Sequence, residues 1–206
     1  VFVVESFMDE LAEKLNIDPL EFRYNILKNQ DTKANQRLKN VLAVVADKIT
    51  WQNKPEQGRY RGIACCNYTH AQTFAAHAIE VSVSADKLVE IHRCVVAVDC
   101  GIVVDPDGLK AQIEGSLAWA LSAAFKNEIT FTDGAVDQGS FSDYQVLRMN
   151  EMPPLEIILI ESAESPGGGG EPAVPSVGPA LCNAIYAATG ERIRTLPIKT
   201  HGYKLV

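Results

Sequence analysis

Residues 79–98 read IEVSVSADKLVEIHRCVVAV, and the fold follows from this stretch. Apolar and polar residues alternate from Ile79 to Val83, which is typical of a strand with one buried face. A short turn is expected at residues 85–87. Apolar residues then resume from Leu88 to Val98, and their alternation slips near Arg93, as it does at a β-bulge. We therefore predict an antiparallel β-hairpin here.

Three amphipathic helices are predicted ahead of this hairpin. The apolar face of the first consists of Val4, Met8, Leu11 and Leu15. Asp9 and its acidic neighbours are expected on a solvated face of that helix. Asp18, followed by Pro19, has the residue types of an N-cap and a first helical position, so a second helix begins there. A polar linker over residues 28–36 leads to the third helix, whose apolar positions run from Leu38 to Ile49.

A fourth helix is predicted to begin at Asp105 and Pro106 and to run to about Phe125. Its core-facing residues are Leu109, Ile113, Leu117, Leu121 and Ala124. A second stripe on this helix consists of Gly108, Gln112, Gly115 and Trp119. Because each glycine in a helix interior costs roughly 1 kcal/mol, this face is expected to approach something closely. That partner is either a neighbouring sheet or a ligand, to which the Gln112 amide can donate and accept hydrogen bonds.

The remaining elements complete an α+β fold. They are a buried strand at Leu155–Ile160, a helix through Leu181, Ile185 and Ala188 that ends at Gly190, a closing strand at Arg192–Ile198 and a peripheral tail from Lys199 to Val206. The predicted architecture is a set of N-terminal helices followed by a mixed, mainly antiparallel sheet packed with two further helices. We expect a helical connector over residues 1–50 and a second part over residues 51–206.

Composition excludes several classes of function. The 26 acidic and 19 basic residues leave a net charge of −7, which argues against a nucleic-acid-binding surface. The five cysteines form no Cys-x-x-Cys pair and the four histidines are scattered, so we expect reduced, buried thiols and no metal-ligand site. His77 is expected to be a hydrogen-bonded packing residue. The default compartment is the cytoplasm, unless an N-terminal signal precedes Val1 and directs the protein to the periplasm or a membrane.

The strongest candidate for a functional segment is the run of glycines Gly167–Gly170, which is followed by Glu171 and Pro172. A phosphate-binding loop needs a lysine and a hydroxyl group after its last glycine, and Glu171 and Pro172 occupy those places. Nucleotide phosphate binding is therefore disfavoured. From the residues alone, Glu171 is either a general base at the edge of a cleft or a solvated acid on a flexible turn.

Several segments together resemble the C-terminal end of the molybdenum hydroxylases, the xanthine oxidase and aldehyde oxidase family. They are Pro166–Pro172, Pro179–Gly190, Arg192–Ile198, Val98–Pro106 with Gln112–Gly115, and Asp9–Ala12 with Asp18–Arg23. The resemblance is greatest to the large subunits of the isoquinoline 1-oxidoreductase and membrane-bound aldehyde dehydrogenase branch, and it covers nearly the whole chain.

The resemblance implies an oxidoreductase that carries molybdenum on molybdopterin, as its cytosine dinucleotide. It implies that Gln112, Gly169 and Gly170 contact the cofactor and that Glu171 is the general base. The expected reaction hydroxylates an N-heterocycle or oxidises an aldehyde, with water as the source of oxygen. Electrons would leave through an iron–sulfur subunit or domain.

The chain starts at Val1, and the glycine-rich cofactor loops that the family carries upstream of the helical connector are not in it. We therefore expect a C-terminal piece of a longer subunit, whose remaining molybdopterin-binding part is a partner. By itself the piece is expected neither to retain molybdopterin nor to turn over substrate. The alternative is a non-catalytic domain that binds a small ligand or a partner through Gly167–Gly170. The enzymatic hypothesis requires Glu171 and Gln112 to share one cleft.

Overall fold

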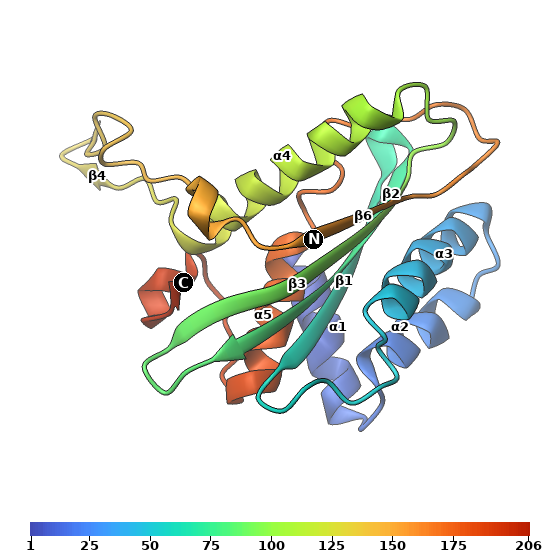
Figure 1. Ribbon diagram of the computed structural model, residues 1–206, viewed down its shortest axis with the longest axis horizontal. Helices are drawn as coiled ribbons and strands as arrows, with labels where there is room; N and C mark the ends of the chain where they lie inside the picture. Colours follow the sequence, from blue (N-terminus) through green and yellow to red (C-terminus); the bar gives the residue numbers. More distant parts are fainter.

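A computed structural model describes residues 1–206 as one sheet with helices on both of its faces (Figure 1). The strands of this five-stranded sheet are, in spatial order, β1 (Tyr60–Tyr68), β2 (Thr73–Val83), β3 (Leu88–Asp99) and β6 (Leu155–Leu159), with β7 (Lys204–Leu205) beside the start of β3. Strands β1, β2 and β3 pair antiparallel, whereas β6 and β7 run parallel to β3. The prediction of an α+β fold with a mixed, mainly antiparallel sheet is confirmed.

The helices divide between the two faces of the sheet. They are α1 (Phe2–Lys14), α2 (Pro19–Lys28), α3 (Lys33–Lys48), α4 (Pro106–Phe125) and α5 (Val177–Thr189). Helix α3, supported by α2, covers one face, while α5 and α4 cover the other and α1 lies beside α5 (Figure 1). Helix α5 lies directly on β1 because Gly62 has no side chain, and a Cβ at that position would be 2.1 Å from the Ala180 carbonyl oxygen.

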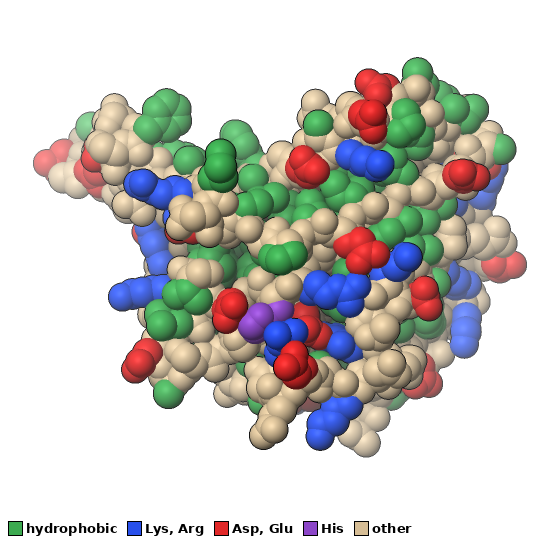
Figure 2. Space-filling view, viewed as in Figure 1, with side chains coloured by type: hydrophobic (Ala, Val, Ile, Leu, Met, Phe, Trp, Pro, Cys, Tyr) green, Lys and Arg blue, Asp and Glu red, His purple; other side chains and the backbone are tan.

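A projecting arm connects α4 to β6 (Figure 1). It contains the two-residue strands β4 (Phe131–Thr132) and β5 (Ala135–Val136) and the 3₁₀ turn η2 (Met149–Glu151). Large apolar side chains, among them Phe131, are exposed on this arm, which Figure 2 shows standing away from the body of the molecule. No helix of the chain is long and apolar enough to cross a lipid bilayer.

The predicted hairpin and its bulge are confirmed. Glu80 pairs with Arg93 and Val81 pairs with Ile91, so His92 is the extra residue that causes the alternation to slip. The expectation of one solvated face is wrong at Glu80, which is buried. Arg61 Nε donates to the Glu80 carboxylate at 2.7 Å, and this compensation permits the burial of the charge.

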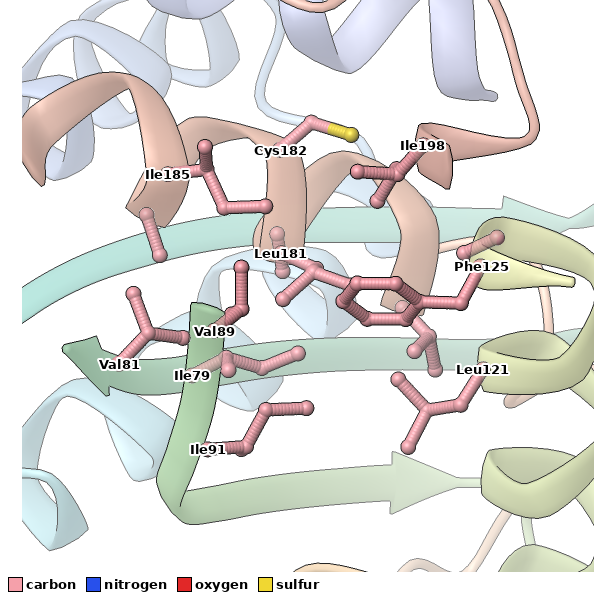
Figure 3. Packing of buried hydrophobic residues seen from close by; sticks show 14 of the residues in the cluster. Ile79, Val81, Val89, Ile91, Leu121, Phe125, Leu181, Cys182, Ile185 and Ile198 are labelled. Atoms are coloured by element: carbon pink, nitrogen blue, oxygen red, sulfur yellow. The ribbon is translucent and has the colours of Figure 1, made fainter. Parts of the chain in front are cut away.

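The main hydrophobic core joins the hairpin to α4 and α5. Figure 3 shows Ile79, Val81, Val89 and Ile91 of the sheet facing Leu121 and Phe125 of α4 and Leu181 and Ile185 of α5, while Cys182 of the same cluster points away from the sheet. A second core on the opposite face joins α2 and α3 to alternate residues of the same strands. Because β2 is buried on both faces, the sheet holds the two layers together.

The predicted face of α1 is wrong. Val4 and Leu15 are exposed, whereas the acidic residues Glu5 and Asp9 are buried. Glu5 Oε2 accepts from Arg23 Nε at 2.9 Å and also from the Cys65 backbone N–H. Periodicity assigns acids to solvent, but here each buried carboxylate has an arginine partner, since Arg192 donates to Asp9 at 2.7 Å. Burial raises the pKa of Asp9, and the hydrogen bond from Arg192 offsets this only in part.

Other element boundaries differ from the predictions in physically understandable ways. Helix α3 begins at Lys33, inside the predicted linker, because the Thr32 hydroxyl caps it. Strand β6 is a half-buried edge strand and not a buried one. The pattern does not predict β1 because its central residues, Gly62 to Cys66, are buried on both faces and show no alternation.

The C-terminal end also differs from the prediction. Arg192–Ile198 is not a strand, because Arg192 and Arg194 extend to carboxylates of α1 and Pro197 has no N–H to donate. A 3₁₀ turn, η3 (Ile198–His201), follows. The tail is not peripheral, since Tyr203 is buried in the main core.

Replacing Arg23 by Met is expected to destabilise the fold by about 3–5 kcal/mol, because Glu5 is left as a buried charge without its partner. Lys33→Met provides the control, since the Lys33–Glu164 pair is exposed and its loss costs less than about 1 kcal/mol. Urea unfolding of the two variants checks the difference. Equal costs would mean that the Glu5–Arg23 pair does not fix α1 on the sheet.

His77 is a buried packing residue, as predicted, on the α5 side of β2. Its Nδ1 lies 2.9 Å from the Ser176 hydroxyl oxygen, and its Nε2 has no partner. Burial lowers the pKa of His77 to about 3, so the folded chain holds this imidazole neutral.

His77 is expected to make the folded state less stable as the pH falls from 6.5 towards 3. The unfolded chain takes up the proton near pH 6.5 and the folded chain does not, so the loss approaches about 1.4 kcal/mol per pH unit. Between pH 7 and pH 5, His77→Asn should therefore lose about 2 kcal/mol less than the wild type in urea unfolding. His70→Asn, at an exposed position, is the control, and wild-type behaviour of His77→Asn would contradict the assignment.

Candidate active site

A hollow of about 370 Å³ lies between α4 and the glycine-rich segment that follows β6. Its lining consists of Gln112, Gly115, Ser116, Trp119, Gly170, Glu171 and Val174. A larger hollow of about 520 Å³ follows the edge strand β6, but its walls are mostly aliphatic. The smaller hollow is the better candidate site, because several polar groups from two separate elements converge on it.

Helix α4 presents its glycine stripe to this hollow because its opposite face is fixed in the core. The Asp105 carboxylate caps the helix by accepting from the Gly108 N–H at 3.1 Å. Ile113 and Leu117 are buried, which leaves Gln112 and Trp119 exposed on the other side, with 72% of Trp119 accessible. The predicted helix and its apolar face are confirmed.

Close packing on a sheet does not explain Gly115. A Cβ built at this glycine would meet no atom within 4 Å. At Gly108 the Cβ would meet only the side chain of the capping residue, Asp105. Gln112, Gly115 and Trp119 of the stripe line the open hollow, so packing against a sheet does not explain this face, and the ligand contact stays a prediction.

The first two loop glycines contact the protein itself. The Gly167 N–H donates to the Cys100 carbonyl oxygen at 2.6 Å, and the Gly168 N–H donates to the Ala71 carbonyl oxygen at 2.8 Å. A Cβ on Gly167 would lie 2.3 Å from that Ala71 oxygen. Both residues are glycines because the loop crosses the segment at Ala71 with its backbone in direct contact, which leaves no room for a side chain.

The next two glycines approach the hollow. A Cβ on Gly169 would lie 2.6 Å from Leu109 Cδ1, so Gly169 borders α4 just outside the lining. Gly170 lines the hollow, and a Cβ there would meet nothing within 4 Å. The backbone N–H groups of Gly169, Gly170 and Glu171 have no acceptor within the chain, which leaves three donors beside the site.

Glu171 is exposed at the wall of the hollow that faces α4. The structure brings Glu171 and Gln112 to one hollow, which is the geometry that the enzymatic hypothesis requires. Tyr68 Oη donates to Glu171 Oε1 at 3.4 Å, and Glu171 Oε2 has no partner. One oxygen of this carboxylate is therefore free to accept a proton.

The end of β3 supports the loop. The Asp99 carboxylate accepts from Arg37 Nη2 at 2.6 Å and from the Gly101 N–H at 3.1 Å. Burial alone would raise the pKa of Asp99, but these hydrogen bonds lower it, so the group stays ionised. A Cβ on Gly101 would lie 2.1 Å from the Ser165 carbonyl oxygen, so the start of the glycine loop rests on this glycine.

Sequence reasoning missed three residues of this site. Ser116 and Val174 line the hollow, and Ser116 Oγ donates to the Gly170 carbonyl oxygen at 3.1 Å. Ser116 follows Gln112 by one helical turn, so helical spacing could have found it. No spacing could have found Tyr68, which is 103 residues from Glu171 in the chain.

The residues of the chain show no grouping of three or more His, Cys, Asp or Glu side chains that could hold a metal ion. All five cysteines are free and buried. Burial raises the pKa of Cys66 to about 11 and that of Cys94 to about 12, so these thiols stay protonated at neutral pH. The polar groups of the hollow can form hydrogen bonds with a ligand.

The structure is an α+β domain with an open hollow between a helix and a glycine loop. Residues 5–153 match the molybdopterin cofactor-binding domain, and the chain belongs to this family.

Curated relatives agree with this membership. The chain is 31% identical to the beta chain of isoquinoline 1-oxidoreductase from Brevundimonas diminuta, over 96% of this chain and 25% of the relative. It is 32% identical to the membrane-bound aldehyde dehydrogenase (pyrroloquinoline-quinone) of Gluconacetobacter polyoxogenes, over 95% of this chain and 27% of the relative. The chain thus spans about a quarter of the length of each of these two relatives.

Solved structures share the fold. The aldehyde oxidoreductase from Desulfovibrio gigas superimposes with a TM-score of 0.74 over 98% of this chain and 39% of its own, at 15% identity. The aldehyde oxidoreductase from Desulfovibrio desulfuricans gives a TM-score of 0.75 over 95% of this chain and 39% of its own, at 14% identity. The mixed sheet with its two helical layers is therefore the fold of a segment of these larger chains.

The residues of the hollow fit a molybdopterin cofactor. The bare backbone at Gly115 and Gly170 leaves room that a Cβ would fill. The Gln112 amide and the unpaired N–H groups of the loop can bind the heteroatoms of a pterin or the oxygens of a phosphate.

Gly115→Ala tests whether this face of α4 is open, and Gly167→Ala in the tightly packed loop provides the contrast. Gly115→Ala is expected to stabilise the fold by about 1 kcal/mol, because alanine is the better helix former and its Cβ meets no atom. Gly167→Ala is expected to destabilise it by about 1–3 kcal/mol, because its Cβ collides with the Ala71 backbone. Urea unfolding measures both changes, and a destabilising Gly115→Ala would show that the α4 stripe is packed.

Proposed function

We propose that this chain is the cofactor- and base-bearing part of a molybdopterin-dependent oxidoreductase. The proposed reaction hydroxylates an N-heterocycle or oxidises an aldehyde, and water is the source of oxygen. The observation that carries the proposal is the meeting of Gln112, Gly115, Gly170 and Glu171 in one hollow. The family membership and the names of the relatives support it, since these include an isoquinoline oxidoreductase and a membrane-bound aldehyde dehydrogenase.

In this proposal the cofactor is held by the side-chain amide of Gln112 and by the backbone N–H groups of Gly169 and Gly170. We propose that this cofactor is the cytosine dinucleotide form of molybdopterin. When bound, it supplies the redox chemistry by taking up the two electrons that leave the substrate. The chain's own residues orient the group, and the lack of side chains at Gly115 and Gly170 allows it to lie close to the backbone.

Glu171 is the proposed general base. Its free oxygen, Oε2, accepts the proton of a hydroxyl group held in the hollow, which makes the oxygen of that group nucleophilic. A positioned base of this kind accelerates a reaction by typically ~10² to 10⁴-fold.

The proposal places the chain within a larger subunit. We propose residues 1–50 as a helical connector and residues 51–206 as the molybdopterin-binding subdomain, with α3 packed on the sheet. The hollow is open and only seven residues line it, so the remaining part of the enzyme would close it. For this reason we expect the isolated 206-residue chain neither to retain the cofactor nor to turn over substrate. An iron–sulfur subunit or domain is the proposed electron acceptor.

A non-catalytic role for the Gly167–Gly170 loop is the competing hypothesis. Gly167 and Gly168 contact the chain itself, which leaves Gly170 as the glycine that lines the hollow. The loop alone therefore offers little surface to a partner. The two hypotheses differ in what they require of the Glu171 carboxylate.

Glu171→Gln, made in the complete enzyme, is expected to lower turnover by at least about 10²-fold with the molybdenum content unchanged, because the amide cannot take up a proton. Initial rates with benzaldehyde and isoquinoline, with ferricyanide as electron acceptor, measure turnover, and elemental analysis measures the metal. Glu114→Gln, on the exposed side of α4 and outside the hollow, is the matched control and should keep the wild-type rate. A near-normal rate in Glu171→Gln would favour the binding-domain hypothesis.

A further inference from the structure

The turn after β1 and the first residue of β2 are each attached to the glycine loop by a hydrogen bond. The Gly168 N–H donates to the Ala71 carbonyl oxygen at 2.8 Å, and the Thr73 hydroxyl donates to the Gly168 carbonyl oxygen at 2.6 Å. Tyr68 begins this turn as the N-cap of the 3₁₀ segment η1 (Thr69–Ala71). These contacts fix the backbone that carries Tyr68 relative to the loop that carries Glu171.

Tyr68 is the one side chain that forms a hydrogen bond with the Glu171 carboxylate, and it has no other side-chain partner itself. The two oxygen atoms, Tyr68 Oη and Glu171 Oε1, are 3.4 Å apart. This separation exceeds the ~2.7 Å typical of O–H···O bonds, so the contact is a long hydrogen bond. An exposed glutamate without such a partner would sample several rotamers.

We propose that Tyr68 is a positioning residue for Glu171. Its hydroxyl donates to Oε1, holds the carboxylate in one rotamer and leaves Oε2 as the oxygen that accepts the proton. This inference rests on the proposed role of Glu171 as general base. Tyr68 itself exchanges no proton with the substrate in this scheme, and it acts only through the carboxylate.

Tyr68→Phe in the complete enzyme removes only the hydroxyl group. We expect kcat to fall about tenfold, the lower end for the loss of a hydrogen bond to a charged group. The KM and the melting temperature should not change, because the phenyl ring and the turn remain. Tyr60→Phe is the matched control, since Tyr60 lies at the other end of β1 and its hydroxyl forms no hydrogen bond in the structure; all three values should stay at the wild-type level.

A second background separates positioning through Glu171 from a general effect of the tyrosine. Glu171→Asp keeps a carboxylate but shortens it by one methylene, which takes it out of reach of the Tyr68 hydroxyl. Tyr68→Phe should therefore cause no further decrease in kcat in this background. An equal decrease in both backgrounds would show that Tyr68 acts elsewhere and would overturn the inference.

The outcomes also separate this inference from the proposed function. If Glu171→Gln abolishes turnover and Tyr68→Phe has the wild-type kcat, the positioning role is wrong and Glu171 remains the base. If Glu171→Gln turns over normally, the proposed function itself fails, whatever Tyr68→Phe does.

Discussion

Close backbone contact at three glycines is the constraint on which the arrangement of the chain depends. Gly62 lets α5 lie on β1, Gly101 lets the start of the glycine loop cross the end of β3, and Gly167 lets that loop rest on the turn after β1. A Cβ at any of the three would lie within 2.3 Å of a backbone oxygen. Because backbone cannot move aside as a flexible side chain can, these contacts fix where the loop leads, and Glu171 is brought to α4 as a result.

Charge pairs that are at least half-buried connect the helices to one another and to the sheet. Arg23 connects α2 to Glu5 of α1, Arg37 connects α3 to Asp99 at the end of β3, and both pairs lie within 2.9 Å. Such pairs add little net stability compared with well-packed apolar residues, but leaving one partner alone is costly. We interpret them as interactions that select one packing arrangement. Asp99 also accepts from the N–H of Gly101, the glycine on which the start of the glycine loop rests.

The candidate site is a surface built from two distant parts of the chain. Helix α4 contributes an amide and a bare backbone, while the loop contributes a carboxylate and unpaired N–H groups. All these groups lie at an open hollow, and the neighbouring arm exposes Phe131 and other large apolar side chains (Figure 2). In the proposal, this chain therefore supplies two sides of the site and the base, and the rest of the enzyme would close the open side.

The five helices, the β2–β3 hairpin with its bulge, the cap at Asp105 and the stripe on α4 could be predicted from the sequence, because each depends on residues within a few positions of one another. Strand β1 could not, because its central residues are buried on both faces and show no alternation. The buried face of α1, the end of the chain and the contact of Tyr68 with Glu171 were decided only by the tertiary structure. Glu5 and Asp9 are acids that periodicity assigns to solvent, and the arginines that permit their burial are remote in the sequence. The local sequence pattern predicts which face of a helix is apolar. Whether a charged residue is buried depends instead on which distant partner the fold brings to it.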